Sequence, residues 1–143
     1  ELIPIINDSL GFLDKSYLLV KEDGYYGVFT KSGKEVMSSK YDKILPFVEY
    51  EQLVWPIIYK QKNKVGMISK SGTVLKLPKH KQLRYLKNGL YGYSFKEKWG
   101  VMNRSGQVLI EAKYDEIGHY EQGILIVREN GKWLKVSKQG KKR

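Results

Sequence analysis

The sequence predicts an all-β fold of tandem antiparallel β-hairpins, arranged as an open curved array of repeats about 34 residues long. Three observations predict it. Glycine and basic residues recur in register along the chain, and short apolar runs alternate with glycine-containing turn sequences. No window shows the sustained 3.6-residue apolar period of a long helix. A single hairpin is marginal in water, so neighbouring copies are expected to pool their apolar faces into one core.

The register of the repeat is set by one position, occupied by Gly27, Gly66, Gly100 and Leu134, with spacings of 39, 34 and 34 residues. Six positions later every copy has a glycine, namely Gly33, Gly72, Gly106 and Gly140. The preceding position holds aromatic or apolar residues, namely Tyr26, Val65, Trp99 and Trp133. We expect these four side chains in the core, and the glycine beside them permits the close approach of a backbone or a ring.

Each copy is expected to contain two hairpins. The first joins two apolar runs through the basic turn, within residues 28–37, 67–75 and 101–110, because glycine supplies the positive φ that such a turn needs. The second precedes it, as where Asp23-Gly24 joins residues 17–20 to residues 25–29. Asn130-Gly131 has the same place before Trp133. Asp-Gly and Asn-Gly between apolar runs are the strongest short-range hairpin signals.

The repeats predict one domain over residues 1–143. It divides into a part-repeat at 1–25, complete repeats at 26–64, 65–98 and 99–132, and a part-repeat at 133–143. Because the two part-repeats are complementary, a second arrangement stays open. In that alternative, the N-terminal strand around Leu2-Ile3 pairs with residues 133–136 and closes a propeller-like ring. In the open array, the chain is expected to be a piece of a longer repeat protein.

Composition excludes several function classes. The chain carries 26 Lys+Arg against 15 Asp+Glu, a formal net charge of +11, and it has no cysteine. Disulfides and thiolate metal sites are therefore excluded, and we predict no cofactor or metal site. The apolar runs are too short to span a bilayer as a helix. The first residues lack the basic start of a signal peptide, although a signal removed before this numbering is compatible with the sequence.

Catalysis has little support in the sequence. His119 has Asp115, Glu116 and Glu121 near it along the chain, but no G-x-S-x-G nucleophile motif accompanies it. His80 lies between two lysines in a position that other copies fill with tyrosine. We interpret both histidines as structural and predict no enzyme activity. A deep pocket in which His119 meets a pair of carboxylates would favour a small hydrolase or transferase instead.

Two kinds of side chain are candidates for binding. The basic turn residues Lys31, Lys70, Arg104 and Lys138 recur at one repeat position, and residues 132–143 add further cations without an acid. These cations could bind an anionic polymer. Lysines in turns also make a β protein soluble and prevent its strand edges from pairing with other chains, and we favour this second interpretation. The chain also has eleven tyrosines, most of them expected to be structural. The candidates for contact with a partner are Tyr91, Tyr93 and Tyr120.

The third copy carries a family resemblance. Residues 98–110 (KWGVMNRSGQVLI) followed by residues 113–117 (KYDEI) resemble the WG repeat, also called the KWG repeat, of bacterial proteins. Only Trp99-Gly100 is a literal Trp-Gly pair. The family usually has an acid before the basic turn residue, where this chain has Thr30, Ser69, Asn103 and Ser137, so a role for that acid is not expected. The resemblance implies a β-rich repeat of envelope or secreted proteins, with no catalytic activity and no established ligand.

These observations together predict a non-enzymatic interaction module that binds another protein at a bacterial cell envelope or in a secreted protein. The alternative is polyanion binding, to nucleic acid, acidic glycan or anionic lipid headgroups, through the basic hairpin turns.

Overall fold

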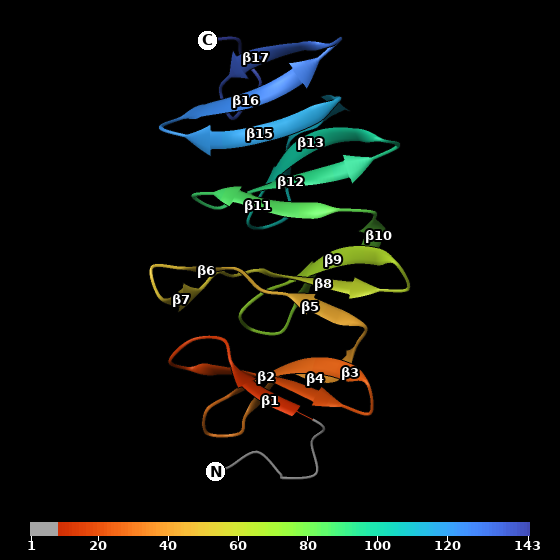
Figure 1. Cartoon of the computed structure of the whole chain (residues 1–143), viewed down its shortest axis with the longest axis vertical. Helices are drawn as coiled ribbons and strands as arrows, with labels where there is room; N and C mark the ends of the chain where they lie inside the picture. Colours follow the sequence, from red (N-terminus) through yellow and green to blue (C-terminus); the bar gives the residue numbers. More distant parts are fainter. Residues whose placement is uncertain (1–8) are drawn as a thin grey trace. The chain divides into compact units, whose positions relative to one another are not determined.

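The computed structural model describes residues 9–143, and this part of the chain consists of strands and turns without a helix (Figure 1). Its strands form antiparallel sheets, none of which closes on itself. The predicted all-β class and the tandem antiparallel hairpins are therefore confirmed.

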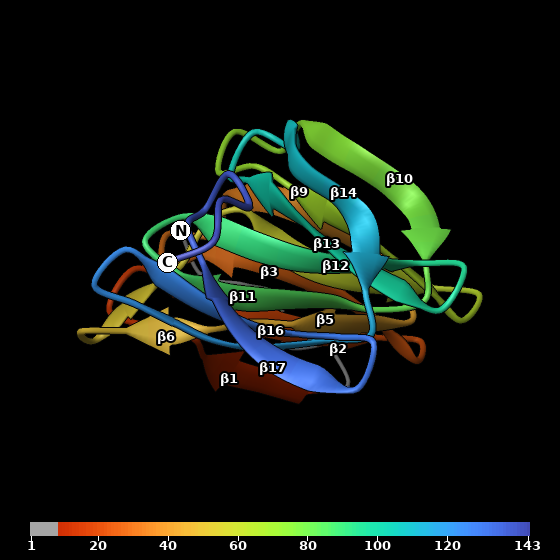
Figure 2. The ribbon, with the colours of Figure 1, turned by 90° about the horizontal axis from the view of Figure 1, so that it is seen from above.

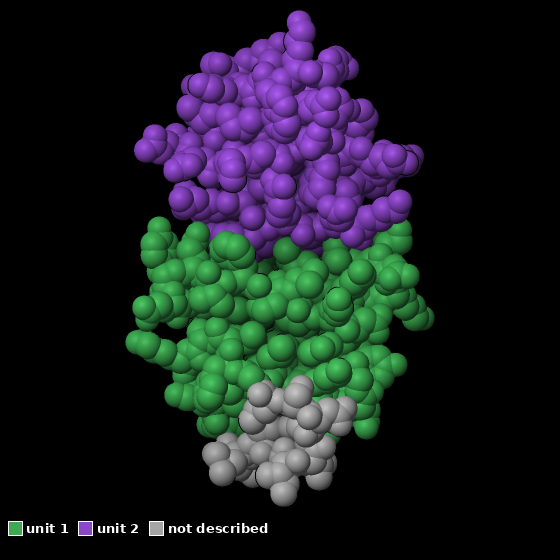
Figure 3. Space-filling model, in the orientation of Figure 1, with its two compact units in different colours: residues 1–79 green, residues 80–143 purple. Residues whose placement is uncertain are grey.

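The chain divides into two compact units, each with its own core (Figure 3). Unit 1 comprises the described residues up to Lys79, and its core cluster includes Val28, Met37 and Tyr59. Unit 2 comprises residues 80–143, and its core cluster includes Val101 and Leu125. The proposed extent of one domain over residues 1–143 stays a prediction.

Unit 1 is built on two four-stranded sheets and a small hairpin. The first sheet has the order β1 (Ser9–Phe12), β2 (Tyr17–Glu22), β3 (Tyr25–Thr30), β4 (Glu35–Tyr41). The second has the order β10 (Val74–His80), β9 (Lys64–Ile68), β8 (Ile57–Gln61), β5 (Lys43–Leu45). The hairpin consists of β6 (Val48–Glu49) and β7 (Gln52–Leu53). Strand β10 ends on His80, the first residue of unit 2.

Unit 2 also consists of two consecutive antiparallel sheets. Its four-stranded sheet has the order β11 (Leu83–Lys87), β12 (Leu90–Phe95), β13 (Lys98–Asn103), β14 (Val108–Tyr114). A three-stranded sheet follows, with β15 (Glu116–Glu121), β16 (Ile124–Glu129) and β17 (Lys132–Val136). The repeat position that begins a copy in the sequence, such as Trp99, lies in the third strand of a sheet. The structural repeat is thus shifted along the chain relative to the repeat defined from the sequence.

The four basic turns have the same geometry. Their glycines have φ between 88° and 97°, and each glycine N–H donates to the carbonyl three residues earlier at 2.8–3.0 Å. That earlier residue in turn donates its N–H to the carbonyl four residues further on, at 2.7–2.9 Å. The equivalent reversals expected from the sequence are therefore present in all four copies. The glycines are Gly33, Gly72, Gly106 and Gly140.

The close approach expected at the first repeated glycine is also present. A methyl group on Gly100 would lie 2.5 Å from the Ile110 carbonyl oxygen and 2.6 Å from Cζ of Tyr93, which stands directly opposite Gly100. Gly66 is enclosed in the same way by Tyr59 and the Lys76 carbonyl. Glycine is required here because backbone and ring occupy the space of a side chain.

The side chains before these glycines are less uniform than predicted. Val65 is buried, and Tyr26 and Trp99 are half-buried against the cores of their units. The prediction that Trp133 lies in the core was wrong, because 54% of its surface is exposed. Trp99 has Tyr114 of the fourth strand beside it, whereas the sheet of Trp133 has three strands in the described chain.

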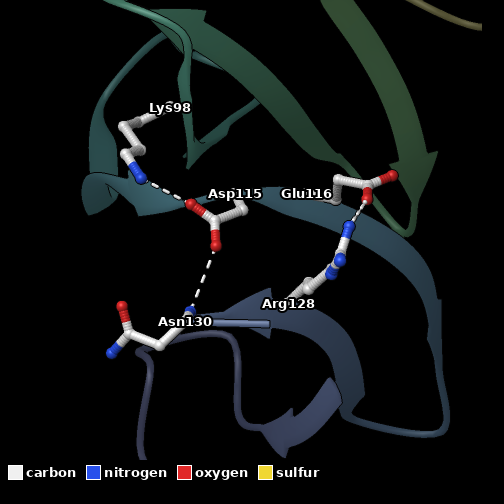
Figure 4. A network of polar contacts seen from close by, with 5 residues as sticks. All are labelled: Lys98, Asp115, Glu116, Arg128 and Asn130. Atoms are coloured by element: carbon white, nitrogen blue, oxygen red, sulfur yellow. Dashed lines mark hydrogen bonds and ion pairs between the residues drawn. The ribbon is translucent and has the colours of Figure 1, made fainter. Parts of the chain in front are cut away.

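Asp115, from the repeated Tyr-Asp pair, links the strands of unit 2 (Figure 4). One carboxylate oxygen accepts from the Lys98 ammonium at 2.5 Å and the other accepts from the Asn130 backbone N–H at 3.1 Å. The neighbouring Glu116 pairs with Arg128 at 2.6 Å. The Lys98 contact lowers the pKa of the Asp115 carboxyl below its ordinary value. Asp42 holds the equivalent turn of unit 1 by accepting from the Lys62 N–H.

The alternative of a closed ring depended on Leu2-Ile3, which lie outside the described residues. The strand expected to receive them, β17, pairs with β16 and, at Val136, with Lys142 of the same chain.

Candidate functional site

The basic turns emerge at a defined end of each sheet. In an antiparallel sheet, the connection between the first two strands and the connection between the last two strands lie at the same end. We call this the turn end. In unit 1 the Lys31 N–H donates to the Ser16 carbonyl at 3.0 Å, which joins the two connections of the first sheet. In unit 2 a methyl group on Gly89 would lie 2.6 Å from the Arg104 guanidinium, so this side chain covers the other turn.

One connection at the turn end of unit 1 is longer than its counterparts. The first repeat has 39 residues where the next two have 34, and the five extra residues fall between β5 and β8. We call residues 46–55 the arm. It folds back on itself as β6 and β7 around Tyr50 and Glu51, both with positive φ, and the Val54 N–H donates to the Phe47 carbonyl. In Figure 1 it extends beside its sheet. Insertions of this kind in repeat proteins often form the binding face.

The arm and the loop before β2 enclose a cleft of about 300 Å³. Asp14 holds the two together: one carboxylate oxygen accepts from the N–H groups of Ser16 and Tyr17 at 2.7 and 3.0 Å, and the other accepts from the Leu53 N–H of the arm at 2.8 Å. Tyr17 and Trp55 meet edge to face with ring centroids 5.3 Å apart. The lining combines aromatic rings, carboxylates and two ammonium groups, from Asp14, Lys15, Tyr17, Tyr50, Glu51, Trp55 and Lys70 among others.

The arm exposes three apolar side chains. Tyr50 at its tip is 85% exposed, and Phe47 and Val48 are exposed by almost half. Isolated exposed apolar side chains are ordinary, but three of them within four consecutive positions beside a cleft form a candidate contact surface.

The predicted cationic residues are all exposed, and the structure brings some of them together. Lys70 lines the cleft, and Lys31 is joined to the Ser16 loop on the edge of the same cleft. In unit 2, Arg104 lies over Gly89, and Lys138 is in the last turn. Two of the four predicted cations, Lys31 and Lys70, therefore lie near the same cleft in unit 1.

The prediction that three tyrosines contact a partner was wrong. Tyr91, Tyr93 and Tyr120 are 1%, 6% and 8% exposed, so they are core residues. Tyr93 packs over Gly100 and directs its hydroxyl at the Ile110 carbonyl, and burial raises the pKa of its phenol. The exposed aromatic residues of the arm are instead Tyr50 and Phe47. The signal that would have located them is the length of the first repeat, because an insertion in a repeat is placed on the surface.

The two histidines have different surroundings. His80 is buried, with Nδ1 2.9 Å from the Ser94 carbonyl and its ring beside Tyr93. His119 is exposed beside a shallow hollow that Arg84 also lines. Within residues 9–143, His119 makes no hydrogen bond or ion pair with a carboxylate, and no cluster of three or more potential metal ligands is present. The arrangement that would favour catalysis is not assembled there.

Residues 99–133, which run from β13 into β17, match the family model of the WG-containing repeat. This match covers one repeat of the chain, the copy in which the sequence showed the resemblance. No curated protein matches the chain closely enough to count as a relative. In the part of the chain that the structure describes, no helix has the length and apolarity needed to cross a membrane.

The Trp99-Gly100 pair of the matched repeat has a clear physical role. Gly100 lets the Tyr93 ring and β14 approach β13, while the Trp99 ring packs beside the Arg84 guanidinium at 5.9 Å. Arg84 in turn donates to the carbonyls of Ile117 and Gly118 in the next sheet. The pair therefore helps to connect consecutive sheets within unit 2.

The turn position usually acidic in the family keeps a shared role in this chain. Asn103 Oδ1 accepts from the N–H groups of Ser105 and Gln107, both at 3.0 Å. The hydroxyls at the equivalent positions accept from the backbone of their own turns in the same way. A neutral side-chain oxygen thus holds each turn in this chain without an acid. The residues are Thr30, Ser69, Asn103 and Ser137.

Proposed function

We propose that this protein, one repeat of which matches the WG-containing repeat, is a non-enzymatic interaction module that binds a protein partner through the arm and cleft of unit 1. A bacterial cell envelope or a secreted protein is the setting that the family resemblance implies, and it is part of the same proposal. The observation that carries the proposal is the arm, on which Phe47, Val48 and Tyr50 are exposed and Tyr50 also lines the cleft.

The chemistry of this surface suits a protein partner. Tyrosine and tryptophan dominate the energetics of protein interfaces, because they bury a large apolar area at a small cost in conformational entropy. The charged groups of the cleft are of both signs, with Lys15 and Lys70 against Asp14 and Glu51. The Asp14 carboxylate is already occupied by three backbone N–H groups. Such a surface is expected to hold its partner at moderate salt, unlike one that binds through charge alone.

The proposal is tested with a photo-crosslinking amino acid placed at Tyr50 in the full chain, in the native host. The matched control carries it at Phe95, which is also an exposed aromatic residue but lies in unit 2 at the opposite end of its sheet. We expect a discrete crosslinked protein from position 50 and none from position 95. Truncation of two interface aromatics costs on the order of 30-fold in affinity, so the partner should bind a Phe47→Ser/Tyr50→Asn variant that much more weakly. Equal crosslinking from both positions, or unchanged affinity, contradicts the proposal.

The alternative function is polyanion binding through the basic turns. It is favoured by one observation, the exposure of all four turn cations, Lys31, Lys70, Arg104 and Lys138. A triple variant with glutamine at positions 31, 70 and 104 should then lose salt-sensitive retention on heparin or DNA. Retention equal to that of the unmodified protein would remove this alternative.

A further inference from the structure

The first strands of the two sheets of unit 2 lie against each other. Strand β11 is at the edge of its four-stranded sheet, beside β12 (Figure 2), and β15 is at the edge of the following sheet. The two strands contact each other and adjoin a shallow hollow of about 340 Å³, which we call the unit 2 hollow. It is lined by Arg84, Tyr85 and Leu86 from β11 and by Gly118 and His119 from β15.

Both strands carry a β-bulge at the hollow. The register between β11 and β12 shifts after Tyr85, and the register between β15 and β16 shifts between Ile117 and Tyr120. A bulge changes the direction of a side chain and is frequent beside functional sites. Tyr85 and His119 are 34 residues apart and therefore occupy the same repeat position, at which the arm of unit 1 begins with Pro46. One place in the repeat thus carries both the arm of unit 1 and the hollow of unit 2.

The guanidinium group of Arg84 is held in one position. Its Nη2 donates to the carbonyls of Ile117 and Gly118 at 2.5 and 2.8 Å, and the group lies 5.9 Å from the centre of the Trp99 ring. Within the described chain, Nη1 and Nε make no hydrogen bond, so they remain free to donate. A guanidinium that is fixed in advance loses little conformational entropy when it binds an anion.

The charge of Arg84 is not balanced by an acid at the hollow. No acid lines it, and β11, β12 and β13 contain none. Strand β15 has two acids, of which Glu116 pairs with Arg128 at 2.6 Å and Glu121 is the last residue of the strand. His119 is exposed and makes no hydrogen bond within residues 9–143, so its ring adds a second donor beside the guanidinium. The hollow is therefore suited to an anion.

A tyrosine ring completes the hollow. Tyr85 is half-buried and meets the buried Tyr91 edge to face, with ring centroids 5.2 Å apart, which holds its ring in place. Leu86 extends the apolar surface and packs against the core of unit 2. An aromatic face of this kind suits the apolar C–H face of a sugar ring. A sugar ring that carries a carboxylate matches both halves of the hollow.

We propose that the unit 2 hollow binds a uronic-acid residue of an acidic glycan. The sugar carboxylate accepts hydrogen bonds from Arg84 and His119, and the sugar ring packs on Tyr85. Because the hollow is shallow and open, the neighbouring sugars of a polymer can continue over the surface on both sides. The site is independent of the protein-binding arm in unit 1. It narrows the polyanion alternative to one ligand class and uses none of the four turn cations.

The test is an NMR titration of the full chain with trigalacturonic acid and with its methyl ester, in which the same sugar rings carry no charge. The backbone amide signals of Gly118 and His119 report on the hollow. We expect the acid to shift these signals and the ester to leave them unchanged. A triglutamate peptide carries carboxylates without sugar rings and should bind much more weakly than the trisaccharide.

Variants assign the binding to individual side chains. Losing a charge-assisted hydrogen bond costs on the order of 30-fold in affinity, so Arg84→Gln should bind trigalacturonic acid that much more weakly. Arg104→Gln is the matched control, because it removes the same charge from an exposed turn of unit 2, and its affinity should be unchanged. Because Arg84 also connects two sheets, His119→Ala supplies a variant without structural hydrogen bonds to lose, and we expect about 5-fold weaker binding. Circular dichroism checks that each variant is folded.

Several results would overturn the proposal. Equal losses in Arg84→Gln and Arg104→Gln would favour general attraction to the basic turns instead. Unchanged affinity of His119→Ala, or equal binding of the acid and its ester, would show that the hollow does not hold the carboxylate. Triglutamate that binds as tightly as the trisaccharide would identify a site for acidic peptides instead.

Discussion

Replacing Gly100 by alanine tests the packing role of the repeated glycine. The new methyl group would lie 2.5 Å from the Ile110 carbonyl oxygen and 2.6 Å from the Tyr93 ring. Neither group has room to move, because the carbonyl belongs to the β14 backbone and the ring is 6% exposed. Strands β13 and β14 must therefore separate by about 0.5 Å before the contact becomes tolerable.

Overpacking of this severity costs about 3 kcal/mol, a large part of the 5–15 kcal/mol that stabilises a typical domain. We expect Gly100→Ala to lower the Tm by roughly 6–12 °C, measured by thermal and urea unfolding followed by circular dichroism. Gly92→Ala is the matched control in the neighbouring strand, where the nearest atoms to a new methyl group are at an ordinary 3.5 Å. We expect a change of less than about 1 kcal/mol there. Equal stability of the two variants would refute the assignment of a packing role to Gly100.

The remaining predictions concern turn capping and pH. Asn103→Ala leaves two turn N–H groups without their side-chain acceptor and should cost about 1 kcal/mol in urea unfolding, whereas Lys31→Ala, at an exposed position of an equivalent turn, should cost less. Because Lys98 lowers the pKa of Asp115 below 3.8, the stability contributed by this carboxylate is present above that pH and lost as the pH falls through the lowered pKa. The stability difference from Asp115→Asn should therefore shrink in acid, and a pH-independent difference would contradict this. Burial raises the pKa of Tyr41, Tyr59 and Tyr114 above 10.0, so their contribution is present below pH 10 and lost as the pH rises further. A phenolate titration of the folded chain should show a late group of tyrosines, and a single titration at the ordinary value would count against their burial.

Local chemistry explains which features were predictable from the sequence. A turn that needs positive φ selects glycine, so Gly33 and its equivalents marked the hairpins directly. The close packing at Gly100 was likewise predictable, because a repeated glycine next to a tryptophan indicates that a backbone or ring approaches closely there. Both signals depend on residues close together in the sequence.

The candidate site depends on burial, which the sequence specifies less directly. Tyrosine suits both a core and an interface, so nothing local separates the buried Tyr91 from the exposed Tyr50. The location of the arm follows from the five extra residues of the first repeat, but its fold depends on positive φ at Tyr50 and Glu51, which neither residue type favours. Trp133 differs from Trp99 only through the strand that packs beside it.

The central claim is that one β unit is copied along the chain with equivalent reversals. Solution NMR of the full chain tests it most directly, through the φ angles of Gly33, Gly72, Gly106 and Gly140 and the cross-strand contacts around them. The account predicts φ near +90° at all four glycines, with the residue three positions before each paired to the residue just after it. Different φ values among the four, or helical chemical shifts in these segments, would contradict it.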